Sequence, residues 1–154
     1  MSRASERGFT LLEMVCVLAL IAMMAAVLLP FVPRQTTRSR LQAYALQAAA
    51  LLKEDRNAAI RRGVGVATLI DAGNRQIRSG ATAQMIRIPQ DVRFDALLPR
   101  ICDRREALST ISFFASGMSC GGAITLSRLD IGYEVRVNWL TGRVEIVSRN
   151  AIAN

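Results

Sequence analysis

The sequence predicts an α+β protein in which a long N-terminal helix is followed by an antiparallel, sandwich-like β-sheet domain. Three observations support this fold class. Residues 14–32 form an apolar run without a charged side chain, and apolar residues then recur at helical spacing over residues 41–59. After Gly63 the hydrophobic period changes to two, which is typical of strands. Because every strand candidate follows the helical segments, we expect the sheets to form one domain behind the helix.

The first 33 residues are expected to hold a basic leader and a membrane-spanning helix. The leader, residues 1–8, reads "MSRASERG", and the apolar run begins directly after it. As a helix, residues 9–29 are about 30 Å long, which matches the hydrocarbon core of a bilayer. The alternative is a secretory signal peptide, but its apolar part is shorter and ends at a small-x-small site. Here the run continues past Ala25 and Ala26, so we expect cleavage before the run and retention of residues 9–33 as the anchor.

Glu13 is the only charged residue between Arg7 and Arg34. A carboxylate at membrane depth is costly and usually marks a function or a pairing. Cleavage between Gly8 and Phe9 would create an ammonium group close to Glu13, and a neighbouring helix shifted along its axis would bring the two groups closer still. Glu13 would then set the register between packed helices. In the second interpretation, Glu13 lies near the membrane interface and its carboxylate reaches water.

The segment "GFTLLEMVCVLALIAMMAAVLLP" resembles the N-terminus of type IV pilin-like proteins, which carry a class III signal. The resemblance implies cleavage after Gly8 by a prepilin peptidase and N-methylation of the new first residue, Phe9. It also implies assembly into a helical filament in which Glu13 pairs with the amino terminus of an adjacent subunit. The chain would cross the cell inner membrane once, with its C-terminal domain in the periplasm.

Residues 34–62 are expected to continue the helix in amphipathic form, and residues 63–154 to form a β-rich domain. Two arginines followed by Gly63 are typical of a helix C-terminus. The first strand candidates are "VGVATLI", "AQMIRI", "STISFFA" and "AITLS". Residues 89–109 lack a regular pattern, and we expect them to form a loop.

The clearest hairpin joins "YEVRVNW" through "LTG" to "RVEIVS". Strict alternation in the first of these segments places one set of side chains on a single face of the sheet. This set comprises Tyr133, Val135, Val137 and Trp139.

The segments "ISFFASGMSCGGAITL" and "YEVRVNWLTGRVEIV" resemble the GspH/FimT family of minor pilins. Together with the N-terminus, they imply a pilin-like structural minor pseudopilin of type II secretion. Such a subunit would sit at or near the tip of the periplasmic pseudopilus, which drives folded exoproteins across the outer membrane. The implied partners are the other minor pseudopilins of the I, J and K types, the major pseudopilin, the prepilin peptidase, the inner-membrane assembly platform and inner-membrane lipid.

A periplasmic location also bears on the cysteines, because disulfides form in that compartment. A bridge between Cys102 and Cys120 would tie the 89–109 loop to the glycine-bearing turn at residues 117–122. The alternative is two separate, half-buried thiols. Cys16 lies in the apolar run and is expected to be a small packing residue.

The chain is basic, with 20 Lys and Arg against 12 Asp and Glu. This excess favours either a general surface charge or a site for a polyanion. In the second interpretation the protein is a minor type IV pilin, FimT-like, involved in pilus assembly or DNA uptake through its β-domain. Glu145 follows closely after Gly142 and Arg143 and weakens that hypothesis. The candidate polyanion contacts near the final hairpin are Arg128, Arg136, Arg143 and Arg149.

No pattern in the sequence indicates an active site. Histidine, the commonest general base and metal ligand, is absent. The acidic residues are scattered through expected loops, and no cluster has the spacing of a metal site. We therefore expect neither an enzyme nor a bound metal or cofactor, and a membrane-anchored hydrolase is the remaining alternative.

Overall fold

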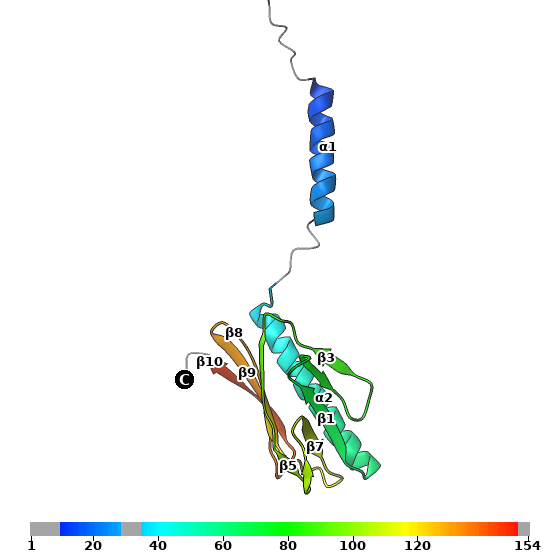
Figure 1. The fold of residues 1–154 in the computed structure, drawn as a ribbon, viewed down its shortest axis with the longest axis vertical. Coiled ribbons are helices and arrows are strands. Elements are labelled where there is room, and N and C mark those ends of the chain that lie inside the picture. The colour runs from blue at the N-terminus through cyan, green and yellow to red at the C-terminus, as the bar shows by residue number, and fades with distance from the viewer. Residues whose placement is uncertain (1–9, 29–34, 151–154) are drawn as a thin grey trace, which may run out of the picture. The chain divides into compact units, whose positions relative to one another are not determined.

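The computed structural model describes residues 10–28 and 35–150. It divides into two units, Met1–Gln35 and Thr36–Asn154. Helix α1 (Leu11–Leu28) belongs to the first unit, and all other elements belong to the second (Figure 1). The predicted anchor, residues 9–33, begins and ends on residues outside the described ranges. Within the described ranges, no helix reaches the length and apolar character needed to span a membrane.

Helix α2 (Arg38–Arg62) is the central element of the second unit. Its expected start at residue 34 differs from the observed one, since residues 35–37 are not helical. Thr37 has an extended backbone, and its hydroxyl accepts a hydrogen bond from the Arg40 N–H at 3.4 Å, which fixes the first turn. At the other end Gly63 adopts φ 67°, a left-handed conformation that glycine accommodates without strain.

Two four-stranded antiparallel sheets follow, with the orders β3-β2-β1-β7 and β10-β9-β8-β4, and a short pair, β5-β6. The α+β prediction with antiparallel sheets is therefore confirmed. The strands are β1 (Val66–Asp71), β2 (Gln76–Arg78), β3 (Met85–Arg87), β4 (Arg93–Leu97), β5 (Ile101–Cys102), β6 (Arg105–Glu106), β7 (Thr110–Phe113), β8 (Gly122–Arg128), β9 (Ile131–Val137) and β10 (Val144–Asn150).

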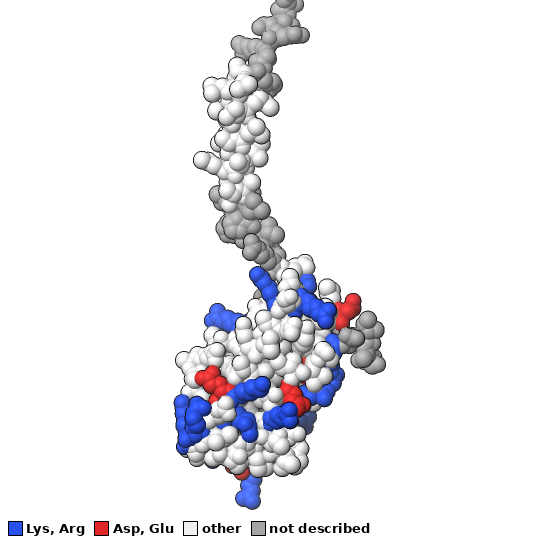
Figure 2. Space-filling model, turned by 180° about the vertical axis from the view of Figure 1, so that it is seen from behind, with Lys and Arg blue, Asp and Glu red and all other residues white. Residues whose placement is uncertain are grey.

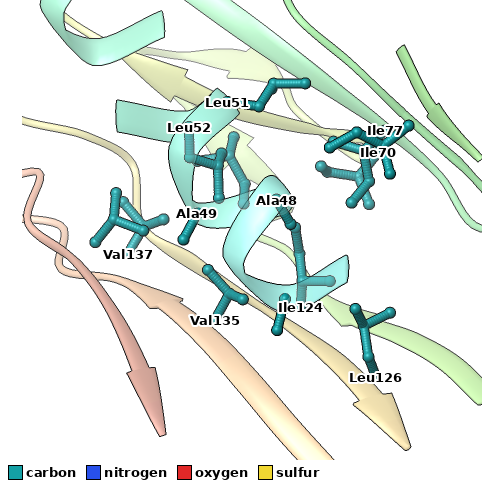
Figure 3. Packing of buried hydrophobic residues seen from close by; sticks show 14 of the residues in the cluster. Ala48, Ala49, Leu51, Leu52, Ile70, Ile77, Ile124, Leu126, Val135 and Val137 are labelled. Atoms are coloured by element: carbon teal, nitrogen blue, oxygen red, sulfur yellow. The ribbon is translucent and has the colours of Figure 1, made fainter. Parts of the chain in front are cut away.

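The hydrophobic core lies where α2 packs against both sheets. Figure 3 shows Leu51 and Leu52 of α2 near Ile70 and Ile77 of the first sheet and Val137 of the second. All buried core residues lie between positions 41 and 144, so the second unit has a core of its own and is expected to fold alone. Truncating one of the fully buried leucines to alanine would cost about 2–5 kcal/mol.

The expectation of a loop at residues 89–109 was wrong, because strands β4, β5 and β6 lie within this range. Strand β4 lies there and pairs with β8, with Phe94 opposite Leu126. The final hairpin is confirmed, since β9 pairs with β10 in a register that joins Val137 to Val144. However, β9 ends at Val137, and Trp139 is 63 % exposed instead of sharing the buried face.

Candidate assembly and binding surfaces

Glu13 lies in the first turn of α1. Its backbone N–H donates to the hydroxyl of Thr10 at 3.3 Å, and the Thr10 carbonyl accepts from the Met14 N–H at 3.3 Å. Thr10 therefore caps the helix, and the Thr-x-x-Glu spacing matches a capping box. The predicted cleavage site at Gly8 and the methylation site at Phe9 lie outside the described residues.

The described apolar side chains of α1 are exposed, including Leu11 at 83 % and Met23 at 72 %. Glu13 is exposed as well. An apolar helix surface of this extent needs lipid or another protein to cover it. The exposed carboxylate of Glu13 is then the one charged group that the described part of this helix offers to a neighbour.

Arg128 belongs to a clamp at the start of α2. Its Nε lies 3.1 Å from an Asp91 carboxylate oxygen, and its Nη1 donates to the Thr36 carbonyl at 2.9 Å. Asp91 also accepts from the Thr36 N–H at 2.6 Å and from its hydroxyl at 2.9 Å. The Thr36 N–H, then its hydroxyl and the Arg128 charge, lower the pKa of Asp91. Arg128, which lies in β8, thus ties the segment before α2 to the second sheet.

Arg136 and Arg149 lie together on the second sheet and share Glu134. The Arg136 Nε lies 2.6 Å from one carboxylate oxygen, and Arg149 pairs with the other. The Glu134 side chain is only 9 % exposed. The hydrogen bond from Arg136, reinforced by the charges of both arginines, lowers the pKa of Glu134, and in turn Glu134 raises the pKa of Arg136.

Arg143 pairs with Glu145 at 3.0 Å across the start of β10. It lines a groove with Lys53 of α2. Fifteen helical steps separate Lys53 from Arg38, which lies two residues after the Thr36 that Arg128 binds, and this is about 22 Å at 1.5 Å per residue. The structure therefore brings Arg136 and Arg149 together, and it places Arg128 far from Arg143. Each of the four predicted polyanion contacts is paired with a carboxylate.

Asp55 is a functional-looking residue that the sequence did not single out. It is fully buried on α2 and accepts hydrogen bonds from the Thr68 hydroxyl at 2.6 Å and from the Ser79 hydroxyl. The N–H groups of Gly80 and Ala81 donate to it at 3.0 and 3.1 Å. Its position was the available signal, because Asp55 lies on the apolar stripe of residues 41–59, three residues after Leu52 and four before Ala59. All four of its partners lie in the first sheet or its β2–β3 loop, so it fastens α2 to that sheet.

Cys102 and Cys120 are bonded in the structure, with their Cα atoms 5.7 Å apart, a separation that a disulfide spans. The bond joins β5 to the segment just before β8. Whether the protein carries this bridge in solution stays a prediction. Within residues 10–28 and 35–150, no three acidic, cysteine or histidine side chains are grouped to hold a metal ion.

On the face of the second unit that Figure 2 shows, lysine and arginine side chains lie with acidic side chains set between them. This interleaving agrees with the ion pairs described above. The basic excess of the sequence is therefore distributed over a mixed surface on this face and does not form a continuous cationic track.

Comparison with known proteins gives three results. Residues 3–29 match the family described as "Prokaryotic N-terminal methylation motif". A curated relative from Xanthomonas campestris pv. campestris, "Type II secretion system protein H", is 34 % identical over 143 residues, which cover 92 % of this chain and 83 % of the relative.

Two kinds of solved structure share the fold. The type IV minor pilin FimU of Pseudomonas aeruginosa aligns with a TM-score of 0.55 at 14 % identity, covering 71 % of this chain and 90 % of FimU. The minor pseudopilin EpsH from the Type 2 Secretion System of Vibrio cholerae aligns with a TM-score of 0.51 at 13 % identity, covering 74 % of this chain and 98 % of EpsH. At these identities the likeness concerns the fold alone.

Proposed function

Because the chain belongs to the family of type II secretion system protein H, we propose that it is a structural minor pseudopilin placed at or near the tip of a periplasmic pseudopilus. The observation that carries this function is the 34 % identity, since it extends over 92 % of the chain and includes both the N-terminal helix and the β-domain. The expected work of the subunit is mechanical. The filament it joins pushes folded exoproteins through the outer membrane.

In this function the N-terminal segment holds the subunit in the inner membrane and then mediates its assembly into the filament. A prepilin peptidase cleaves between Gly8 and Phe9, Phe9 is N-methylated, and residues 9–33 anchor the chain in the inner membrane until it enters the filament. The match of residues 3–29 to a methylation motif supports this. Glu13 then pairs with the amino terminus of an adjacent subunit, and its exposure on α1 supports that role.

The partners proposed are other minor pseudopilins, the major pseudopilin, the prepilin peptidase and the inner-membrane assembly platform. The β-domain recognises neighbouring subunits in the periplasm. Its two sheets are fixed to α2 by a common core, so a force on the helix reaches both sheets together. No catalytic role is proposed for this chain.

The test is a secretion assay in the native host. Deleting the gene should abolish export of folded exoproteins, and the wild-type gene should restore it. Glu13→Gln should leave cleavage intact and reduce secretion strongly, because the pairing charge is lost. Met14→Leu, an apolar exchange one residue away, is the matched control and should secrete normally. Normal secretion after deletion would refute the function.

The second candidate is a minor type IV pilin that takes part in pilus assembly or DNA uptake. The formal charge of +8 favours it, because a basic domain attracts polyanions. In this case deletion should abolish pili or transformation and leave secretion unchanged. The β-domain should also bind duplex DNA with a Kd below about 1 µM at physiological salt, and binding should weaken steeply as salt rises.

A further inference from the structure

A groove of about 630 Å³ runs between α2 and the β9–β10 turn. We call it the α2–turn groove. Helix α2 supplies one wall, and the turn with the first residues of β10 supplies the other. Both walls belong to the second unit, which has its own core. The lining residues are Lys53, Arg56, Asn57, Thr141, Gly142, Arg143, Val144 and Glu145.

The groove carries positive charge that no carboxylate compensates. Arg56 donates from Nε to the Gly117 carbonyl at 3.0 Å and from Nη2 to the Thr141 carbonyl at 3.0 Å, so its partners are neutral. The side chain of Lys53 is exposed, and its ammonium group has no hydrogen bond or ion pair within the described part of the chain. Only Arg143 is matched, by Glu145. Three cations and one carboxylate thus leave an excess of two positive charges.

The turn side of the groove is held in one shape. Asn138 accepts hydrogen bonds at its Oδ1 from the N–H groups of Leu140 and Thr141, both at 3.0 Å. Its carbonyl accepts from the Gly142 N–H at 2.8 Å. A side chain at Gly142 would place Cβ 2.0 Å from the Gly117 carbonyl oxygen, so this packing requires glycine. A wall fixed before binding loses little entropy when a partner arrives.

Two exposed apolar residues precede the groove residues in the β9–β10 turn. Trp139 and Leu140 are 63 % and 53 % exposed and immediately precede Thr141, which lines the groove. Tryptophan and arginine are the residue types that most often dominate the binding energy of protein interfaces. The turn that forms one wall of the groove therefore also carries an exposed tryptophan, two residues before Thr141.

We propose that the α2–turn groove binds an acidic segment of a neighbouring protein subunit, whose carboxylates contact Lys53 and Arg56 and whose apolar side chains pack on Trp139. This inference rests on the proposed function, which places the chain in a protein assembly. Charge complementarity selects the partner, because two localised positive charges fit one or two carboxylates. A nucleic acid fits less well, because a chain of several phosphates needs several cations and this groove leaves two uncompensated.

The test is photocrosslinking with the full chain in cells that make the complete secretion machinery. A photoreactive residue replaces Asn57, which lines the groove without charge, and mass spectrometry locates the adduct. The expected adduct lies in a partner segment rich in Asp or Glu. Lys53→Glu should reduce the adduct at least about tenfold, because it puts two acidic groups face to face. Arg87→Glu, an exposed cation on β3 of the other sheet, should leave the adduct unchanged.

The outcomes separate this inference from the proposed function. Secretion without any adduct at Asn57, an adduct insensitive to Lys53→Glu, or an adduct to nucleic acid overturns the groove inference and leaves the function intact. Normal secretion after deletion of the gene overturns the function, whatever Asn57 contacts. Thermal unfolding of the Lys53→Glu variant should match the wild type, since this side chain is exposed, and a changed melting temperature counts against the inference.

Discussion

Replacing Asp55 should destabilise the β-domain more than its charged sequence context suggests. The carboxylate is fully buried and accepts four hydrogen bonds, two from hydroxyls and two from backbone N–H groups. Asp55→Ala removes the acceptor of the buried Thr68 and Ser79 hydroxyls, whereas Gly80 is exposed to water and the Ala81 N–H also donates to the Ser79 hydroxyl at 3.1 Å. Each of these two buried hydroxyl donors costs about 1–3 kcal/mol when it is left unsatisfied. We therefore expect a loss of about 3–5 kcal/mol in the free energy of unfolding.

That loss is a large part of the stability of a typical domain, which is about 5–15 kcal/mol. Asp55→Asn separates the polar effect from the cavity, because it keeps the shape of the side chain. Its amide presents one acceptor oxygen and turns an NH2 group toward the remaining donors. The expected loss is therefore roughly half of that in Asp55→Ala.

Urea unfolding of residues 35–154 at pH 7, followed by far-UV circular dichroism, measures both variants. A lower midpoint at an unchanged slope is expected, since the variants alter stability and not the area exposed on unfolding. Glu54→Ala, at the adjacent exposed position of α2, is the control and should stay within about 0.5 kcal/mol of wild type. If Asp55→Ala also stays within that range, the network does not hold α2 to the first sheet.

Three further predictions concern the second unit. Glu134 has a lowered pKa in the folded state. Its stabilising effect is therefore complete above the ordinary glutamate pKa of about 4.3 and is lost as pH falls through the folded-state pKa. Glu134→Gln should reduce this loss of stability at low pH, as unfolding measured over a series of pH values would show. Gly80→Ala places Cβ 2.2 Å from a backbone oxygen of β1 and should cost about 1–3 kcal/mol in the free energy of unfolding. Gly73→Ala meets only an ordinary contact at 3.5 Å and should not lower stability. Thermal melts of the two variants measure the difference. Cys102 and Cys120 should resist alkylation in denatured, unreduced protein, and their reduction should cost about 3 kcal/mol; two labelled thiols besides Cys16 would show that the bridge is absent.

The sequence predicted the elements whose apolar residues recur at a regular period. The stripe along residues 41–59 becomes the buried face of α2, and the alternation before Val137 becomes β9. Strand β4 was missed because it lies at the edge of its sheet, between two prolines, and buries a single side chain, that of Phe94. One buried residue in five carries too little periodic signal to distinguish a strand from a loop.

The surfaces were harder to predict than the fold, because their chemistry depends on partners that are distant in sequence. Asp55 lies in the run "KEDR", which in isolation is typical of an exposed helix face, and its partner Ser79 is 24 residues away. Arg128 pairs with Asp91 and donates to Thr36, which lies 92 residues away from it in the sequence. No local pattern encodes that clamp. The turn that forms one wall of the groove was predicted correctly. Its neighbour on α2, Lys53, was not identified from the sequence.

Three polar anchors fasten α2 to the strands along its length. Asp91 holds Thr36 at the start of the helix, Asp55 binds the first sheet, and Arg56 binds the loop at Gly117 and the β9–β10 turn. An apolar core resists separation of two layers, but it resists sliding only weakly, because hydrophobic burial is non-directional. Hydrogen bonds to charged groups are directional and break when the helix shifts by a small distance. A subunit that transmits force through its helix therefore gains rigidity from these anchors that the core alone does not supply.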